Sequence, residues 1–175
     1  MLKNSMLHDK TVVSHHRLLR LLRIGNDMYD CKGLNNLLIE AQNGLKEIMY
    51  SEKAVIYLFD EEINKMYRAK DEHTLEYFDL TCGIIGRVLL TGEIIDTGDP
   101  NNHAAYNMIT DLNTSLPILC MPIKSSKLKK RVGAFQVLNI KGIGSVAKGK
   151  IDVLEVEIIR LFCEQVAVCV ERYTK

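Results

Sequence analysis

Apolar residues recur every three or four positions near both ends of this chain, and β-forming segments stand between them. One series runs over residues 34–48 and another over residues 151–169. This spacing places the apolar side chains on one face of a helix. Because such helices bracket a β-rich centre in a chain of 175 residues, the sequence predicts one α+β domain in which helices cover a sheet.

A further helical pattern precedes these two, over residues 12–29. Its leucines, Leu18 and Leu22 among them, stand between three arginines. This arrangement predicts an amphipathic helix with a basic outer face. Residues 1–10 are expected to form a flexible N-terminus, and residues 11–175 are expected to form the single domain.

Five short segments in the centre are rich in β-forming residues. Residues 54–59 and 66–69 flank a polar turn and predict a hairpin, and residues 75–78 predict a third strand. Residues 116–123 and 132–139 flank a basic turn and predict a second hairpin. We expect this second hairpin at the centre of the sheet.

A short apolar helix is predicted over residues 83–92, and its first backbone N–H groups have no partner within the helix. Ile84 and Ile85 are therefore candidates to donate hydrogen bonds to an anionic or polar ligand. The loop that follows is longer than most connections, as the lids of binding sites often are. A solvated crossover is an equally good interpretation. The polar candidates in this loop are Asp99, Asn101, Asn102, His103, Tyr106, Asp111, Asn113 and Thr114.

The composition argues against several classes of function. The formal net charge is +1, with both signs interspersed, so neither a nucleic-acid nor a membrane partner is indicated. No apolar run is long enough for a secretory signal or a bilayer span, and a cytoplasmic location is expected. The five cysteines are scattered, which argues against a disulfide framework. His15 and His16 are adjacent rather than four residues apart, which argues against a metal site.

Seven short motifs follow one another in a specific order and spacing. They are Ala-Val-Ile-Tyr-Leu-Phe-Asp at residues 54–60, Gly-Ile-Ile-Gly-Arg-Val at 83–88, Thr-Gly-Glu at 91–93, Asp-Pro at 99–100, Tyr-Asn at 106–107, Leu-Cys-Met-Pro-Ile at 119–123 and Gly-Ala-Phe-Gln-Val-Leu-Asn at 133–139. Together they resemble a GAF domain, the small-molecule-sensing module of cyclic-nucleotide phosphodiesterases, phytochromes and many bacterial regulators. The resemblance covers nearly the whole chain and is strongest to the phosphodiesterase branch.

This resemblance implies a central antiparallel sheet, with the N- and C-terminal helices packed on one face and a lid loop with short helices on the other. It also implies that a cyclic nucleotide, cGMP or cAMP, binds between sheet and lid. The implied contacts are Asp71, Ile84, Ile85, Tyr106, Thr114 and Ser115. Asp99 and His103 of the loop are added as ligand-binding candidates, although an exposed loop histidine is the simpler interpretation of His103.

The phosphodiesterase branch also carries an Asn-Lys pair followed by Phe, Asp and Glu, in which the Lys and the Asp form an ion pair. The positions that resemble this signature are Asn139, Lys141 and Asp152. Ile140 separates the first two, and Ile151 stands in place of the Phe. The signature is therefore only partly kept.

An enzyme of this fold, the free methionine sulfoxide reductase, resembles the chain in length and uses cysteines at its helix start and in its lid. Those places read Gly-Ile-Ile-Gly and His-Ala-Ala-Tyr here. A thiol mechanism needs an accessible thiol and a second one that resolves it. Because Cys82 has no evident partner, a non-catalytic domain is expected.

Two functions remain open at this point. One is a sensor that encloses a small ligand and signals through its terminal helices. The other is a structural or protein-interaction subunit of a larger assembly, with a degenerate pocket. In both cases Leu18, Leu22, Ile158 and Phe162 are candidates for contacts in a homodimer or larger assembly. Core packing inside one monomer is the alternative for these apolar stripes.

Overall fold

The computed structural model of this chain describes residues 2–140 and 153–174. Its helices stand at the two ends and its strands between them, as the hydrophobic pattern predicts. The helices are α1 (Leu2–Asp30), α2 (Leu34–Met49), α3 (Gly83–Thr91) and α4 (Val153–Val170), with a 3-10 turn at Pro100–Asn102. The strands are β1 (Lys53–Asp60), β2 (Lys65–Ala69), β3 (Leu75–Asp79), β4 (Ile95–Thr97), β5 (Ile118–Ser125) and β6 (Lys130–Leu138).

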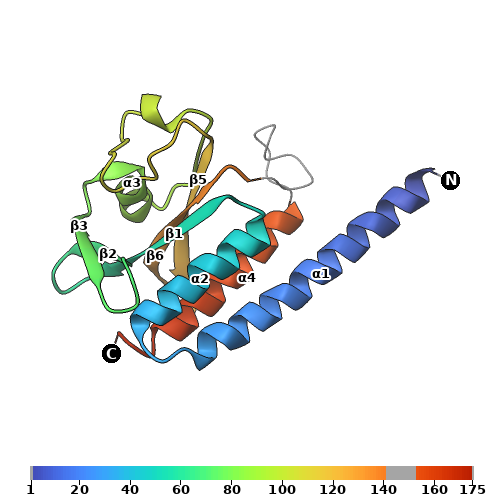
Figure 1. Ribbon diagram of the computed structural model, residues 1–175, viewed down its shortest axis with the longest axis horizontal. Coiled ribbons are helices and arrows are strands. Elements are labelled where there is room, and N and C mark those ends of the chain that lie inside the picture. The colour runs from blue at the N-terminus through green and yellow to red at the C-terminus, as the bar shows by residue number, and fades with distance from the viewer. Residues whose placement is uncertain (1, 141–152, 175) are drawn as a thin grey trace.

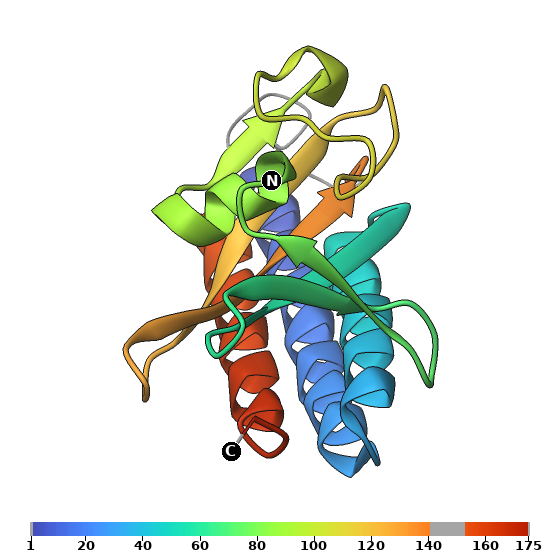
Figure 2. The ribbon, with the colours of Figure 1, turned by 90° about the vertical axis from the view of Figure 1, so that its left-hand side faces the viewer.

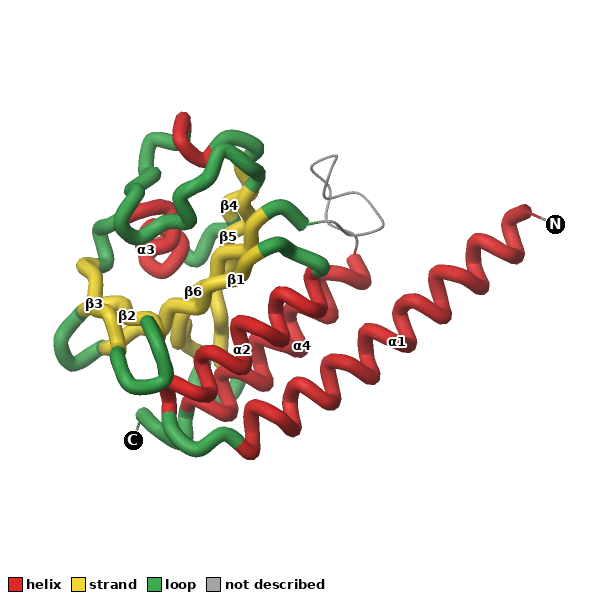
Figure 3. Tube along the Cα trace, viewed as in Figure 1, coloured by secondary structure: helices red, strands yellow, loops and turns green. Residues whose placement is uncertain are grey.

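The strands form one antiparallel sheet in the order β3-β2-β1-β6-β5-β4 (Figure 3). β1 and β6 are the central pair, with Ile56 opposite Phe135. β5 and β6 form the predicted second hairpin, so the predicted α+β class and both hairpins are confirmed. The edge strand β4 was not predicted, because its three residues are too few to show an alternating pattern.

Side chains of the central strands alternate between two separate cores. Ile56 and Leu58 of β1 belong to the core shared with α1, α2 and α4, whereas Val55 and Tyr57 belong to the core beneath α3. Successive side chains of a strand point to opposite faces. Because both faces of β1 are covered, its sequence shows a continuous apolar run instead of an alternation.

Helices α2 and α4 lie directly on one face of the sheet, and α1 packs on the outer side of both (Figures 1 and 2). Leu21, Ile24 and Met28 are buried apolar side chains of α1. Ile24 fits against Gly44 of α2, where a Cβ atom would lie 2.4 Å from it. The N-terminal part of α1 runs past the rest of the domain (Figure 1).

The predicted basic outer face of α1 is only partly confirmed, because the side chains of Arg20 and Arg23 are 41% and 58% exposed but Arg17 is not on that face. Arg17 is buried, and its Nη2 donates to the carbonyl oxygen of Ile48 at 3.0 Å. Arg23 forms an ion pair with Glu47 at 2.7 Å. The long arginine side chains find their acceptors in the seam between the two helices.

The four apolar residues predicted as interface contacts differ in exposure. Leu18 and Leu22 are 39% and 61% exposed on α1, which also begins ten residues before the predicted start. Ile158 and Phe162 of α4 are fully buried in the core beneath the sheet. They contact residues of their own monomer, which corrects their assignment as surface contacts.

The opposite face of the sheet is covered by α3 and by the loop that joins β4 to β5 (Figure 3). This second core is smaller and holds Ile84, Ile85 and Leu112 against Tyr57 and Cys120 of the strands. The expected lid therefore exists as a covering layer, and its contacts decide what it can bind.

Within the two described ranges, the structure contains no helix with the length and apolarity to cross a bilayer.

Candidate functional site

The start of α3 is capped by a carboxylate from the distant loop. Cys82, at the N-cap, makes no side-chain hydrogen bond to the helix. Instead, the Ile84 N–H donates to Oδ2 of Asp111 at 2.8 Å, and the Ile85 N–H donates to Oδ1 at 3.1 Å. Asp111 is 4% exposed, and the helix dipole stabilises a negative charge at this end. The two donors predicted for a ligand thus bind a side chain of the chain itself.

Asp111 accepts two further hydrogen bonds that tie the loop to the sheet. Oδ2 accepts the Asn107 N–H at 2.8 Å, and Oδ1 accepts Nε2 of Gln136 at 2.5 Å. Gln136 is fully buried in β6, and its Oε1 accepts the Leu112 N–H at 3.1 Å. One carboxylate therefore joins α3, the loop and a central strand, with four donors for its two oxygens.

Gly83 allows the loop to approach the helix this closely. Its φ is +79°, and a Cβ atom there would lie 2.2 Å from Oγ1 of Thr110 and 2.8 Å from Oδ2 of Asp111. A side chain at this position would meet both the unfavourable φ and the clash. Thr110 is 1% exposed, and its Oγ1 has no hydrogen-bond partner in the part of the chain that the structure describes.

A second polar connection runs from the sheet to the loop through Tyr57. The Tyr57 hydroxyl donates to the carbonyl oxygen of Thr110 and accepts Nη1 of Arg68 at 2.7 Å. Arg68 is held in turn by Glu76 at 3.0 Å and lies over the ring of Phe78. Burial raises the pKa of Tyr57 to about 12, so the hydroxyl keeps its proton and remains a donor at neutral pH.

Comparison with known proteins gives matches among solved structures. No family model and no curated protein matches the sequence. The GAF domain of a phosphoenolpyruvate-protein phosphotransferase from Coxiella burnetii is 15% identical with a TM-score of 0.68, over 91% of this chain and 95% of that chain. The GAF domain of the Acinetobacter phosphotransferase is 18% identical with a TM-score of 0.65, over 90% and 94%. The free methionine-R-sulfoxide reductase of Neisseria meningitidis, solved with its substrate, is 16% identical with a TM-score of 0.62, over 90% of each chain.

The chain has the GAF fold. Identities of this size establish the arrangement of helices and strands, and the predicted layers are confirmed. The matching structures include one described only as a GAF domain and a sulfoxide reductase. Because one fold carries several functions, the function has to be argued from the side chains at the site.

Asp71 lies away from the Asp111 site within this GAF fold. Its Oδ1 accepts the N–H groups of His73 and Thr74, both at 2.8 Å, in the turn between β2 and β3. Its carbonyl oxygen accepts Nδ2 of Asn35 at the start of α2, on the other side of the sheet from α3. The hydrogen bond from His73 N–H lowers the pKa of the Asp71 carboxyl. The structure thus gives Asp71 a turn-forming role.

The remaining loop candidates make local contacts, with one exception. Asp99 and Thr114 each accept a hydrogen bond from a residue two or three positions later, at 2.7 and 2.9 Å. Nδ1 of His103 accepts a backbone N–H two residues on, at 3.2 Å, and Ser115 is exposed. Tyr106 differs because it packs on the core beneath α3. Its hydroxyl is buried and has no hydrogen-bond partner among the described residues.

Of the signature-like positions, Asn139 alone can be placed, because Lys141 and Asp152 lie outside the described residues. Asn139 follows β6 with a φ of +47°. Its Nδ2 donates to Oε1 of Glu52 at 2.8 Å, and its N–H donates to the carbonyl oxygen of Pro117 at 2.8 Å. These contacts fasten the end of the sheet rather than the α3 site.

Asp111 and Gln136 were not predicted as site residues. Asp111 counted only as one of several polar loop residues, and Gln136 only as part of a motif. A helix start without a capping side chain was the available signal, because its N–H groups need an acceptor from elsewhere in the chain. The sequence does not say which of the loop acids supplies that acceptor.

The two cysteines near this site differ in exposure. Cys82 at the start of α3 is half-buried, whereas Cys120 on β5 is fully buried. Burial raises the pKa of the Cys120 thiol, which disfavours the reactive thiolate. In the described residues, no group of three or more His, Cys, Asp or Glu side chains has an arrangement that fits a metal ion.

Proposed function

We propose that this domain is a non-catalytic regulatory module that acts through α1, by pairing this helix with α1 of a second copy of the chain. The observation that carries the proposal is the apolar character of both sides of α1. Leu21 and Ile24 face inward at 3% and 1% exposure, whereas Leu19 and Leu22 face outward at 51% and 61%. A helix that is apolar on opposite sides is typically covered on both.

The length and position of α1 support the same proposal. The helix has 29 residues, and its N-terminal part runs past α2 and α4 (Figure 1). A helical segment without a packing partner is only marginally stable in water, because most helical stability in proteins comes from tertiary packing. A partner helix that covers this segment supplies such packing.

Charge favours a second copy as that partner. Arg20 and Arg23 both form ion pairs with Glu47 of the same chain, at 3.5 and 2.7 Å. Arg23 also pairs with Asp27 at 3.9 Å. Two α1 helices can therefore approach without an uncompensated arginine repulsion along this edge. A self-complementary apolar face on a single helix suits a two-fold interface, which is the commonest symmetry of soluble oligomers.

Sedimentation equilibrium of the purified chain tests this proposal. We expect a dimer for the wild type and a folded monomer for Leu22→Glu, because the new charge would be buried at the interface. Asn43→Glu is the matched control, since it adds the same charge to an exposed position of α2 outside the proposed face of α1. A monomeric wild type at about 100 μM, or a dimeric and folded Leu22→Glu variant, would contradict the proposal.

A second candidate function is a sensor whose ligand displaces Asp111 from the start of α3. The observation that favours it is the pair of buried hydroxyl groups without partners, on Tyr106 and Thr110. Buried polar groups usually have a hydrogen-bond partner, and a ligand at this place would supply one. The phosphate of a cyclic nucleotide would take the position of the Asp111 carboxylate, since both are anions that suit a helix N-terminus.

Thermal unfolding with 1 mM cGMP or cAMP distinguishes the two candidates. A sensor predicts a higher Tm with one nucleotide, because a ligand at one hundred times its Kd adds about 2.7 kcal/mol of stability. Thr110→Val should remove that shift, whereas Asp71→Ala should keep it, because Asp71 lies on the other side of the sheet. An unchanged Tm with both nucleotides leaves the dimerisation module as the function.

A further inference from the structure

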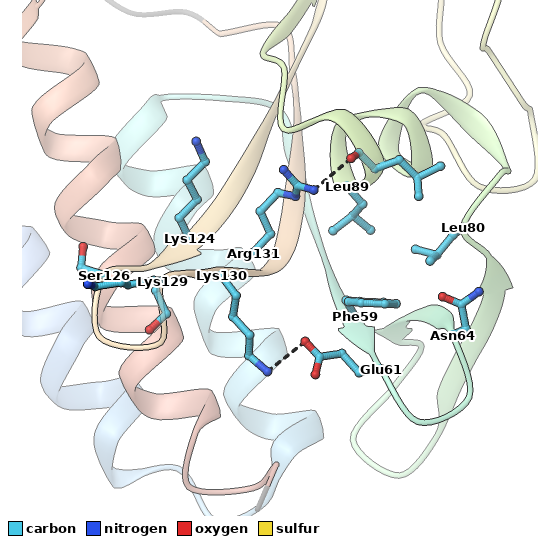
Figure 4. Close-up of a pocket in the computed structure, with 12 residues that line it drawn as sticks. Phe59, Glu61, Asn64, Leu80, Leu89, Lys124, Ser126, Lys129, Lys130 and Arg131 are labelled. Atoms are coloured by element: carbon cyan, nitrogen blue, oxygen red, sulfur yellow. Dashed lines mark hydrogen bonds and ion pairs between the residues drawn. The ribbon is translucent and has the colours of Figure 1, made fainter.

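We propose that a cavity at the C-terminal end of α3 binds a small amphipathic carboxylate, a ligand with an apolar body and one carboxylate group. The cavity has a volume of about 840 Å³, which lies in the usual range for small-molecule sites. It opens between the C-terminal end of α3 and the β5–β6 hairpin (Figure 4). The Asp111 site is at the other end of α3, and α1 packs on the opposite face of the sheet from α3, so this inference is independent of both proposed functions.

The cavity exists because the two central strands, β1 and β6, separate from each other at one end of the sheet. β1 and β6 pair as far as Leu58 opposite Gly133. Beyond that point β6 continues to pair with β5, with Arg131 opposite Lys124, while β1 turns away with β2. Phe59 of β1 and Arg131 of β6 therefore stand on opposite sides of the opening, and both line it (Figure 4).

One side of the cavity is apolar. Phe59 lines it together with Leu80, which precedes α3, and Leu89 in the last turns of α3 (Figure 4). Leu80 and Leu89 are 8% and 5% exposed, so they form a packed surface rather than loose side chains. A flat or aliphatic group placed on this surface would remove apolar area from water, which is worth roughly 25 cal/mol per Å².

The other side carries an excess of positive charge. Lys124, Lys129, Lys130 and Arg131 line the cavity. Lys130 is neutralised by Glu61 at 2.9 Å (Figure 4). Among the described residues, no carboxylate pairs with the other three cations. An anionic group on the ligand would meet this excess charge.

Arg131 is the residue best prepared to hold the carboxylate. Its Nη2 donates to the carbonyl oxygen of Leu90 at 2.9 Å. The guanidinium also lies against Gly92, where a Cβ atom would approach Nη1 to 2.6 Å. These contacts hold the planar group in place, so less side-chain entropy is lost on binding. Its remaining N–H groups have the planar geometry that matches a carboxylate.

Protein-observed NMR of the full chain with two matched probes tests the proposal. The probes are 1-naphthoate, which has an apolar body and a carboxylate, and 1-naphthamide, which has the same body without charge. We expect 1-naphthoate to shift the amide signals of Phe59, Leu89 and Arg131 and to bind at least tenfold more tightly than the amide. Shifts centred elsewhere, no binding of 1-naphthoate, or equal affinities of the two probes would overturn the proposal.

Variants that each remove one positive charge show which side chain binds the carboxylate of 1-naphthoate. Arg131→Gln and Lys124→Gln should each raise the Kd of 1-naphthoate by threefold or more, and Lys32→Gln, between α1 and α2, should leave it unchanged. If Arg131→Gln fails to fold, Lys124→Gln decides alone, because Lys124 is exposed. A folded Lys124→Gln variant with the wild-type Kd would remove the assignment of the ligand charge to this side of the cavity.

Discussion

The Oδ2 atom of Asp111 lies 2.8 Å from the backbone nitrogen of Ile84 and accepts its hydrogen bond. The two residues are 27 positions apart in the sequence, so the contact closes the loop that covers α3. An internal anion thus occupies the place where a helix N-terminus would attract a ligand anion. Any ligand at this place has to compete with a carboxylate that is already desolvated and held by four donors.

Asp111→Ala should lower the free energy of unfolding by about 3 kcal/mol or more, because it leaves several buried donors without an acceptor. Urea unfolding measures this change. Asp79→Ala is the control, since Asp79 makes only an exposed ion pair with Lys65, and surface pairs contribute about 1 kcal/mol or less. Similar losses in the two variants would show that the Asp111 contacts do not stabilise the fold.

Gly83→Ala should lower the free energy of unfolding by about 2 to 4 kcal/mol. The variant would combine an unfavourable positive φ with a clash against Thr110. Gly98→Ala is a matched glycine control, because no atom lies within 4 Å of its added Cβ, and its change should stay within about 0.5 kcal/mol. Urea unfolding of both variants gives the comparison, and equal losses would refute the close approach at Gly83.

Stability should fall in alkaline solution above pH 10. Burial raises the pKa of Tyr57 and of Tyr67 to about 12 from the model-peptide value of 10.0. Below pH 10 both states keep these protons, so stability is unaffected. Between pH 10 and 12 only the unfolded chain releases them, which lowers the free energy of unfolding by about 3 kcal/mol for each tyrosine.

Tyr57→Phe tests the origin of this alkaline loss. The variant should show a shallower decline in the free energy of unfolding between pH 10 and 11 than the wild type does. Tyr29→Phe, at a residue that is 61% exposed, should decline as the wild type does. The slope is read from urea unfolding at several pH values, and an identical slope in wild type and Tyr57→Phe would rule out Tyr57 as a contributor.

Thiol labelling should separate the two half-buried cysteines, Cys31 and Cys82, from the three buried ones. Cys82 is half-buried and should react with a disulfide reagent such as DTNB at pH 8 in the native protein. Burial raises the pKa of Cys163 to about 12, so that this thiol should react only after unfolding. Cys82→Ser should remove the part of the fast labelling that comes from Cys82 and leave the part that comes from Cys31. Fast labelling of Cys120 or Cys163 would contradict the burial on which this expectation rests.

The other half-buried thiol, Cys31, packs on the opposite face of the sheet from Cys82, which leads to an expectation for catalysis. A reductase that uses an attacking cysteine needs a resolving thiol to complete its cycle. We therefore expect no sustained reduction of free methionine-R-sulfoxide by the purified chain with thioredoxin as the reductant, because thioredoxin acts on a disulfide that this chain cannot form near Cys82. Turnover that disappears in Cys82→Ser would instead make this domain an enzyme.

The fold was predictable because its elements carry strong local patterns. The apolar series in residues 34–48 and the run in residues 54–59 each indicate one kind of element and one or two buried faces. The direction in which an arginine side chain points depends less on the local sequence and more on partners elsewhere in the fold. Arg17 was assigned to the outer face, yet it finds a carbonyl acceptor on α2, and no periodicity reveals a partner on another helix.

The site was harder to predict because it depends on a contact between distant residues. Ile84 and Ile85 were correctly identified as positions with N–H groups that seek an acceptor, but the acceptor is Asp111 of the same chain. Asp71 illustrates the opposite case, since a carboxylate that caps its own turn looks the same in sequence as one that faces a ligand. Only the folded chain distinguishes the two.

The length of α1 would amplify any rotation at the turn between α1 and α2. Gly33 there has a φ of +102°, and no atom lies within 4 Å of the place where its Cβ would be. At 1.5 Å per residue, the 29 residues of α1 form a lever roughly 43 Å long. A rotation of about 10° near Gly33 would therefore carry the far tip through about 7 Å by the same geometry. A small rotation of α1 at the turn would therefore move the N-terminal tip of the helix by several ångströms.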